Sequence, residues 1–148
     1  MKKVIFLFVS LIYMGLSASS QNVSGSYTVP SGSLNVDYYN DRCHDSNKNG
    51  RLVIANNSDL AISKAHIYVT VFITWYEQSK RSSYPIKNTK TLELCDDDFY
   101  NIPSHKTIEV TSSKRGVVKG GPEKDGKTYQ YSIQITDVVL EPVPFPEP

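Results

Sequence analysis

One short segment of the chain, DSNKNG, comes closest to a known chemical motif. It fits the first half of an EF-hand calcium loop, D-x-[DN]-x-[DN]-G, with Asp45, Asn47, Asn49 and Gly50. The twelfth position is Asn56 instead of the bidentate Glu, and RLVIAN reads as a strand where the motif requires a helix. An EF-hand is therefore excluded. The alternative is that the Asn-Gly pair supplies left-handed backbone for a turn.

The chain has two cysteines, Cys43 and Cys95, and each lies beside aspartates. An even pair in an exported chain predicts a disulfide, and two unpaired thiols are the alternative. The bridge would place its two Cα atoms about 5 to 6 Å apart. It would bring DSNKNG beside the CDDD segment, so that Asp97 or Asp98 could supply the missing carboxylates. The resulting hypothesis is a weak calcium site; the alternative is a solvated acidic loop. No other cofactor is expected.

Catalytic motifs are missing from the sequence. The three histidines, His44, His66 and His105, lie in an acidic segment, on the polar face of a strand and after a proline. The sequence has no HExxH, no GxSxG and no phosphate-binding glycine loop. We therefore expect that the protein is not an enzyme.

The elements that must position these residues are strands. HIYVTVFITWY alternates strictly, with apolar side chains on one face and His66, Tyr68, Thr70, Phe72, Thr74 and Tyr76 on the other. Further strands are expected at Gly25 to Val29, Ser33 to Tyr39, Arg51 to Asn56, Lys90 to Leu94, Lys106 to Val110 and Tyr129 to Leu140. Seven short strands separated by polar turns predict an all-β fold, a single antiparallel immunoglobulin-like β-sandwich.

The alternation also predicts an aromatic strip. Tyr68, Phe72 and Tyr76 are four residues apart on the same face of their strand, about 13 Å from one to the next. If that face is open, the strip suits a protein partner or a sugar chain. The alternative is that the N-terminal strands, with Tyr27, Tyr38 and Tyr39, cover it as a second layer of core.

The run Gly50 to Gln78, followed by Asn101 to Val110, resembles the central strands of small immunoglobulin-like domains of the FxLYD and fibronectin type III kinds. In those domains a strand ending in Asn or Ser precedes a long core strand, and a turn led by proline opens a later strand. The resemblance implies a binding or spacing module without catalytic residues.

The ends of the chain indicate export. Residues 1–20 have two lysines, an apolar run and then small residues, which predicts a cleaved signal peptide. The run is shorter than the roughly 20 residues that span a bilayer, so no membrane insertion is expected after cleavage. Residues 21–141 would form the β-sandwich domain, and 142–148 a proline-rich tail. The protein would be secreted or periplasmic.

Three functions from different classes fit this sequence. After signal cleavage the formal charge would be −1, from 14 basic and 15 acidic residues, so neither nucleic acid nor an anionic membrane is expected as a partner. The leading hypothesis is an exported module that binds an unidentified protein partner or contributes to a structural assembly. The alternatives are a periplasmic immunity or inhibitor protein that blocks a toxin or hydrolase with a loop such as Ser112 to Gln130, and a carbohydrate-binding module. Asn22-x-Ser24 and Asn56-x-Ser58 match the N-glycosylation pattern, and their use is left open.

Overall fold

The computed structural model describes residues 22–40, 49–115 and 126–142. These residues form seven strands and no helix: β1 (Asn22–Val29), β2 (Gly32–Tyr39), β3 (Asn49–Asn57), β4 (Ile62–Glu77), β5 (Ile86–Ile102), β6 (Thr107–Arg115) and β7 (Thr128–Leu140). The prediction of seven strands is confirmed, and every one of them is longer than the sequence indicated.

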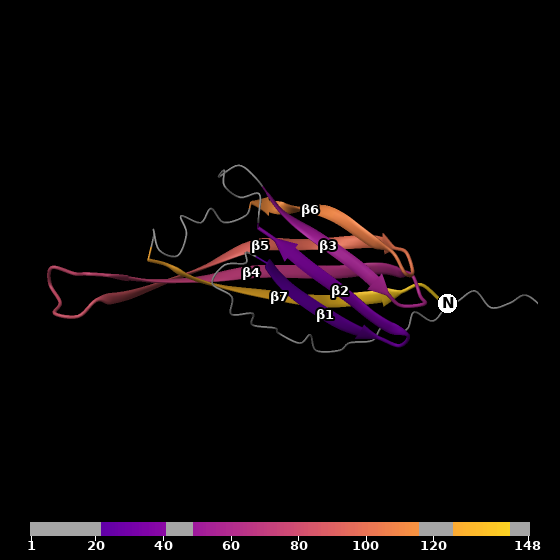
Figure 1. Cartoon of the computed structure of the whole chain (residues 1–148), viewed down its shortest axis with the longest axis horizontal. Helices are drawn as coiled ribbons and strands as arrows, with labels where there is room; N and C mark the ends of the chain where they lie inside the picture. The colour runs from indigo at the N-terminus through magenta and orange to yellow at the C-terminus, as the bar shows by residue number, and fades with distance from the viewer. Residues whose placement is uncertain (1–21, 41–48, 116–125, 143–148) are drawn as a thin grey trace, which may run out of the picture.

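The strands form two antiparallel sheets that pack face to face as a β-sandwich (Figure 1). One sheet has the order β1-β2-β3-β6 and the other β5-β4-β7. The chain passes from one sheet to the other three times, between β3 and β4, between β5 and β6 and between β6 and β7. Because β3 pairs with β6 and β4 pairs with β7, the β3–β4 and β6–β7 crossings interlock the two sheets.

The core lies between the sheets and follows the period-two pattern of the strands. Along β4 the inward residues Ile67, Val69 and Val71 are fully buried, and the residues between them are partly exposed. The facing sheet contributes Leu34, Val36, Tyr38, Leu52 and Ile54, and β7 contributes Tyr131, Ile133 and Ile135. Burial of these apolar side chains supplies the main driving force for the sandwich.

Asn56 fastens one end of the sandwich. Its side chain is fully buried, and its Nδ2 donates hydrogen bonds to the carbonyl oxygens of Leu60 (2.9 Å) and Ile102 (3.2 Å). Its Oδ1 accepts from the Ser58 backbone nitrogen (3.2 Å) and hydroxyl (2.7 Å). The Asn56 backbone nitrogen donates to the carbonyl of Lys106. One residue therefore ties the end of β3 to the connections before β4 and before β6.

The turn expected at Asn49-Gly50 is not present. The Asn49-Gly50 pair was expected to supply left-handed backbone for a turn, but it begins β3, and neither residue has a positive φ. A Cβ atom added at Gly50 would lie 2.1 Å from the hydroxyl oxygen of Tyr38, whose side chain is fully buried. Glycine is therefore needed here for close packing against Tyr38.

The β4–β5 hairpin extends beyond the rest of the molecule. β7 pairs with β4 only as far as Thr74, opposite Thr128, whereas β5 follows β4 to Glu77, opposite Ile86. Figure 1 shows these two strands continuing alone past the sandwich. The sequence predicted β5 only from Lys90 to Leu94, so it did not indicate this extension.

Candidate functional site

The aromatic strip, Tyr68, Phe72 and Tyr76, lies on the outer face of the smaller sheet. The strip residues alternate along β4 with the buried Ile67, Val69, Val71 and Ile73, so they lie on the side away from the core. The exposed fraction is 38% for Phe72 and 63% for Tyr76, and Tyr68 is half-buried. An exposed aromatic row on a regular strand is unusual, because such side chains are generally enriched in cores and at interfaces.

The N-terminal tyrosines do not cover this strip. Tyr27 and Tyr38 belong to β1 and β2 in the other sheet, where both are buried in the core. Tyr39 is half-buried, and the guanidinium of Arg51 lies 4.4 Å from the centre of its ring. Among the described residues, the strip therefore has no second layer of strands over it.

Polar side chains border the strip on both sides. On β7, Gln134 lies opposite Tyr68 and Gln130 opposite Phe72, with Ser132 between them in the same row. On β5, the residues opposite Tyr68, Phe72 and Tyr76 are Asp96, Thr91 and Lys87. The outer face is thus an apolar row with hydrogen-bonding groups along each edge, which is how many binding surfaces are built.

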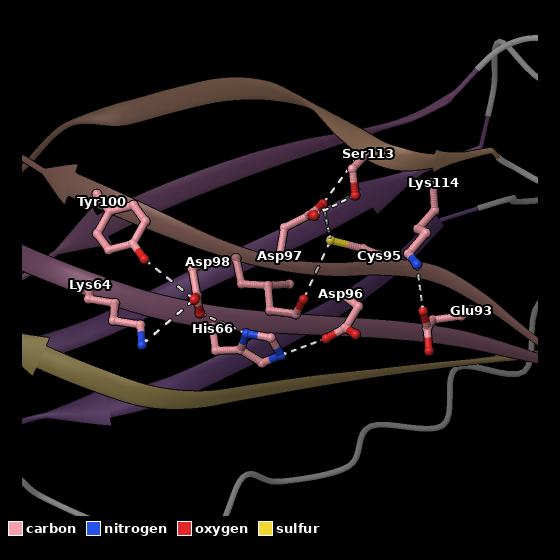
Figure 2. A network of polar contacts seen from close by, with 11 residues as sticks. Lys64, His66, Glu93, Cys95, Asp96, Asp97, Asp98, Tyr100, Ser113 and Lys114 are labelled. Carbon is pink, nitrogen blue, oxygen red and sulfur yellow. Dashed lines mark hydrogen bonds and ion pairs between the residues drawn. The ribbon is translucent and has the colours of Figure 1, made fainter.

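A cluster of charged side chains lies next to Tyr68, at the end of the strip that is farther from the turn between β4 and β5 (Figure 2). His66 lies between two carboxylates, with Nε2 2.9 Å from Asp96 Oδ1 and Nδ1 2.8 Å from Asp98 Oδ1. Lys64 Nζ lies 3.7 Å from Asp98 Oδ2, and the Tyr100 hydroxyl donates to the same oxygen at 3.4 Å. The hydrogen bond from His66, aided by Lys64, lowers the pKa of Asp98. Carboxylates only accept, so this arrangement is fully bonded when both ring nitrogens of His66 carry protons.

Asp97 lies on the opposite side of β5 from Asp96 and Asp98. Its carboxylate accepts hydrogen bonds from the Ser113 hydroxyl and, at 3.1 Å, from the Ser113 backbone nitrogen (Figure 2). Burial raises the pKa of Asp97, but the hydrogen bonds from Ser113 outweigh it and the net shift is downward. Asp97 therefore joins β5 to β6 across the edge of the two sheets.

Cys95 carries a free, buried thiol, so the predicted disulfide with Cys43 is not formed in this structure. Its Sγ lies 3.4 Å from both the Ile67 carbonyl oxygen and Asp97 Oδ2, the two acceptors within reach of its single proton. The thiol is buried because β5 has a β-bulge at this point. Val69 pairs with Cys95 and Thr70 with Glu93, so that Leu94 and Cys95 are both buried. Cys43 lies outside the described residues. Burial, reinforced by the nearby Asp97, raises the pKa of Cys95 to about 12 and keeps the thiol protonated.

The predicted calcium ligands lie only partly within the described residues. Asp97 and Asp98 are on opposite faces of β5, and Asn49 Nδ2 donates to the Ser112 carbonyl at 2.8 Å. Asp45 and Asn47 lie outside the described residues. Among the residues described, no group of three or more His, Cys, Asp or Glu could hold a metal ion. Calcium binding by DSNKNG itself stays a prediction.

The other histidines add no catalytic arrangement to the described residues. His105 Nε2 lies 2.7 Å from Asp59 Oδ1 in an exposed pair, and His44 lies outside the described residues. Within the described part of the chain, neither His66 nor His105 is hydrogen-bonded to a serine or cysteine side chain.

Two groups of residues were missed in the sequence. The Lys64, Asp96 and Tyr100 cluster around His66 was hidden because β5 was expected to end at Leu94. The exposed Tyr84 and Ile86, at the end of the projecting hairpin, lie between two expected strands and were not singled out in the sequence. Most of the expected Ser112 to Gln130 loop, residues 116–125, lies outside the described residues.

Comparisons with known proteins identify no family for this chain. No protein-family model matches the sequence, and none of the curated proteins searched is significantly similar to it. In the described part of the chain, no helix has the length and apolar character needed to span a membrane.

Proposed function

We propose that this protein is an exported, non-enzymatic binding module whose aromatic strip contacts a protein partner. The observation that supports this most strongly is the division of β4 into a buried aliphatic face and an open aromatic one. Tyrosine and phenylalanine side chains bury a large area at low entropic cost, which is why they dominate protein interfaces. We assign the fold to the immunoglobulin-like modules of the FxLYD and fibronectin type III kinds, and the interlocked β3/β6 and β4/β7 pairs support this assignment.

The His66 cluster contributes rigidity at the end of this surface. Asp96 and Asp98 of β5 hold the imidazole beside Tyr68, and Lys64 and Tyr100 in turn contact the Asp98 carboxylate. A surface that is ordered before binding loses less entropy on association than a mobile one. We therefore treat the cluster as a support of the strip, with a charged rim available to a partner.

The experiment compares partner capture from the exported fraction of the host by three proteins. The wild type and a Thr111→Ala control should capture the same partner, because Thr111 is exposed on the other sheet. The variant Tyr68→Ala plus Tyr76→Ala should lose it, with a fall in affinity of about thirtyfold or more if these rings are hot spots. Equal capture by all three proteins would refute the proposal. A melting temperature close to that of the wild type would show that the double variant is folded.

A sugar chain is the second candidate ligand, and the row on β7 favours it. Gln130, Ser132 and Gln134 supply amide and hydroxyl groups beside Tyr68 and Phe72, the combination that holds sugars by stacking and hydrogen bonding. Gln130→Ala plus Gln134→Ala should weaken glycan binding without removing the aromatic row. Absence of polysaccharide binding by the wild type would exclude this candidate, and binding unchanged by these substitutions would exclude the row on β7 as the contact.

A further inference from the structure

The hairpin arm, residues 75–90, is a second surface separate from most of the strip. Beyond Thr74 it has only two strands, in which Tyr76 pairs with Lys87 and Glu77 with Ile86. Figure 1 shows it extending away from both sheets. An isolated two-stranded hairpin is only marginally stable in water, and exposed apolar side chains on it add nothing to folding. Their presence needs an explanation outside the core.

The arm carries three of the five large hydrophobic side chains that are exposed in the described residues. The exposed fraction is 79% for Tyr84, 63% for Tyr76 and 48% for Ile86. They do not share a face: Tyr76 and Ile86 occupy adjacent cross-strand pairs and so point to opposite sides, while Tyr84 lies in the connection. A flat protein surface would cover only one side of the arm. An environment that surrounds its end would cover all three side chains.

The arm is also the positive pole of the molecule. Lys80, Arg81, Lys87 and Lys90 are exposed, and none of them forms an ion pair with another described residue. With Glu77 as its one acid, the arm has a net charge of 4 − 1 = +3. The remainder of residues 21–148 has 10 basic and 14 acidic residues, a net charge of −4. The near-neutral net charge of residues 21–148 was the argument against anionic partners, but it is the sum of a positive arm and a negative remainder.

Hydrogen bonds between residues two or three apart in the sequence order the end of the arm. The Arg81 backbone nitrogen donates to Ser79 Oγ at 3.1 Å, and that of Tyr84 donates to Ser82 Oγ at 3.2 Å. The Ser82 backbone nitrogen donates to the Ser79 carbonyl at 3.5 Å. These local turns order the segment between the strands, so that little entropy would be lost when it binds.

We propose that the hairpin arm binds reversibly to an anionic membrane surface. The four cations contact lipid headgroups, while Tyr76, Tyr84 and Ile86 enter the interfacial region, where tyrosine is favoured. The acidic body is repelled by the same surface, so the charge separation directs the arm toward it. A lipid interface can surround the end of the arm on both faces, which matches the placement of Tyr76 and Ile86. This attachment is peripheral and leaves the sandwich in solution.

The test is sedimentation of residues 21–148 with vesicles. This part of the chain contains all seven strands and the whole core, and it lacks the apolar segment 4–16, which would bind lipid by itself. One set of vesicles contains phosphatidylcholine with about 30% phosphatidylglycerol, which makes the surface anionic. The other set contains phosphatidylcholine alone. The protein should bind the anionic vesicles at about millimolar lipid, bind the neutral ones far less, and be released by high salt.

Substitutions then assign the binding to the arm. Each of Lys80→Gln, Arg81→Gln, Lys87→Gln and Lys90→Gln should lower the partition coefficient by about fivefold, the factor for about 1 kcal/mol per cation. Lys106→Gln is the matched control and should have little effect, because this exposed lysine lies at the opposite end of β5 from the arm. Tyr84→Ser should weaken binding without changing charge. Tyr76 is left unchanged, so that a failure here does not bear on the aromatic strip.

Three results would overturn the proposal. One is equal binding to neutral and anionic vesicles. Another is retention of binding when all four arm cations are replaced. The third is binding to soluble poly-L-glutamate as tightly as to vesicles, with no effect of Tyr84→Ser, which would instead indicate an acidic protein as the partner of the arm.

Discussion

Replacing Asn56 should be the most damaging single polar change in this protein. The side chain is fully buried, and its amide makes four hydrogen bonds: two donated to the carbonyls of Leu60 and Ile102, and two accepted from Ser58. In Asn56→Ala all four are lost, and the Ile102 carbonyl is left buried without this donor. Only the Leu60 carbonyl keeps another side-chain donor, the Ser58 hydroxyl at 2.9 Å.

The expected loss can be estimated from these contacts. A typical intramolecular hydrogen bond contributes about 1 kcal/mol net, and a buried group left unsatisfied costs roughly 1 to 3 kcal/mol. Allowing for partial access of water and for the Leu60 carbonyl, we expect the free energy of unfolding to fall by about 2 to 4 kcal/mol. For a domain of this size that corresponds to a decrease in melting temperature of roughly 8 to 16 °C.

Thermal and urea unfolding followed by circular dichroism would measure this effect. Asn57→Ala is the control, since Asn57 is the next residue along β3 and is exposed. Asn56→Asp is a second variant of nearly the same shape that cannot donate to Leu60 or Ile102, and it should be at least as destabilising as alanine. If Asn56→Ala lay within about 0.5 kcal/mol of Asn57→Ala, the role assigned to this corner would be refuted. The same burial means that Asn56 cannot carry a glycan in the folded protein.

Three further predictions concern Cys95, Gly50 and Asp98. In a Cys43→Ser background, a thiol reagent at pH 8 should react with native Cys95 about a thousandfold more slowly than in urea, since a pKa of about 12 leaves few thiolates; similar rates would contradict this. Gly50→Ala should destabilise the protein by roughly 1 to 3 kcal/mol in urea unfolding, because the added Cβ overlaps the buried Tyr38 ring, and an unchanged midpoint would refute it. The lowered pKa of Asp98 contributes stability that is fully present above the unfolded value of about 3.9 and is lost as the pH falls through the folded value. The difference in melting temperature between wild type and Asp98→Asn should therefore disappear in acid, and a difference that persisted at pH 2 would be inconsistent with it.

The number of strands and their positions along the chain could be predicted from the period-two pattern. HIYVTVFITWY places its aliphatic residues in the core, with Trp75 packed against them, and Tyr68, Phe72 and Tyr76 on the outer face, as the alternation requires. β5 was too short in the prediction because CDDDFYN contains residues that are depleted in strands. Here tertiary pairing with β4 and the contacts of Asp97 and Asp98 outweigh that local preference.

The candidate site shows the same limit. Once β5 is extended through the aspartates, alternation alone places Asp97 on the opposite side of the strand from Asp98. The burial of Cys95 could not be inferred in this way, because it depends on a bulge that turns Leu94 and Cys95 inward together. The aromatic strip is exposed because β1 and β2 belong to the other sheet. The residue pattern within a single strand does not determine the sheet to which that strand belongs.

Photocrosslinking in the host tests the binding function most directly, because it captures a partner of any identity. A photoreactive phenylalanine analogue would replace Phe72, which is 38% exposed in the middle of the aromatic strip, and in a matched protein it would replace Thr111 on the opposite sheet. We predict a discrete crosslinked product from position 72, none from position 111, and loss of the product when Tyr68→Ala and Tyr76→Ala are added. Absence of a product at position 72, or equal products from both positions, would contradict the proposal that the outer face of β4 is the binding surface.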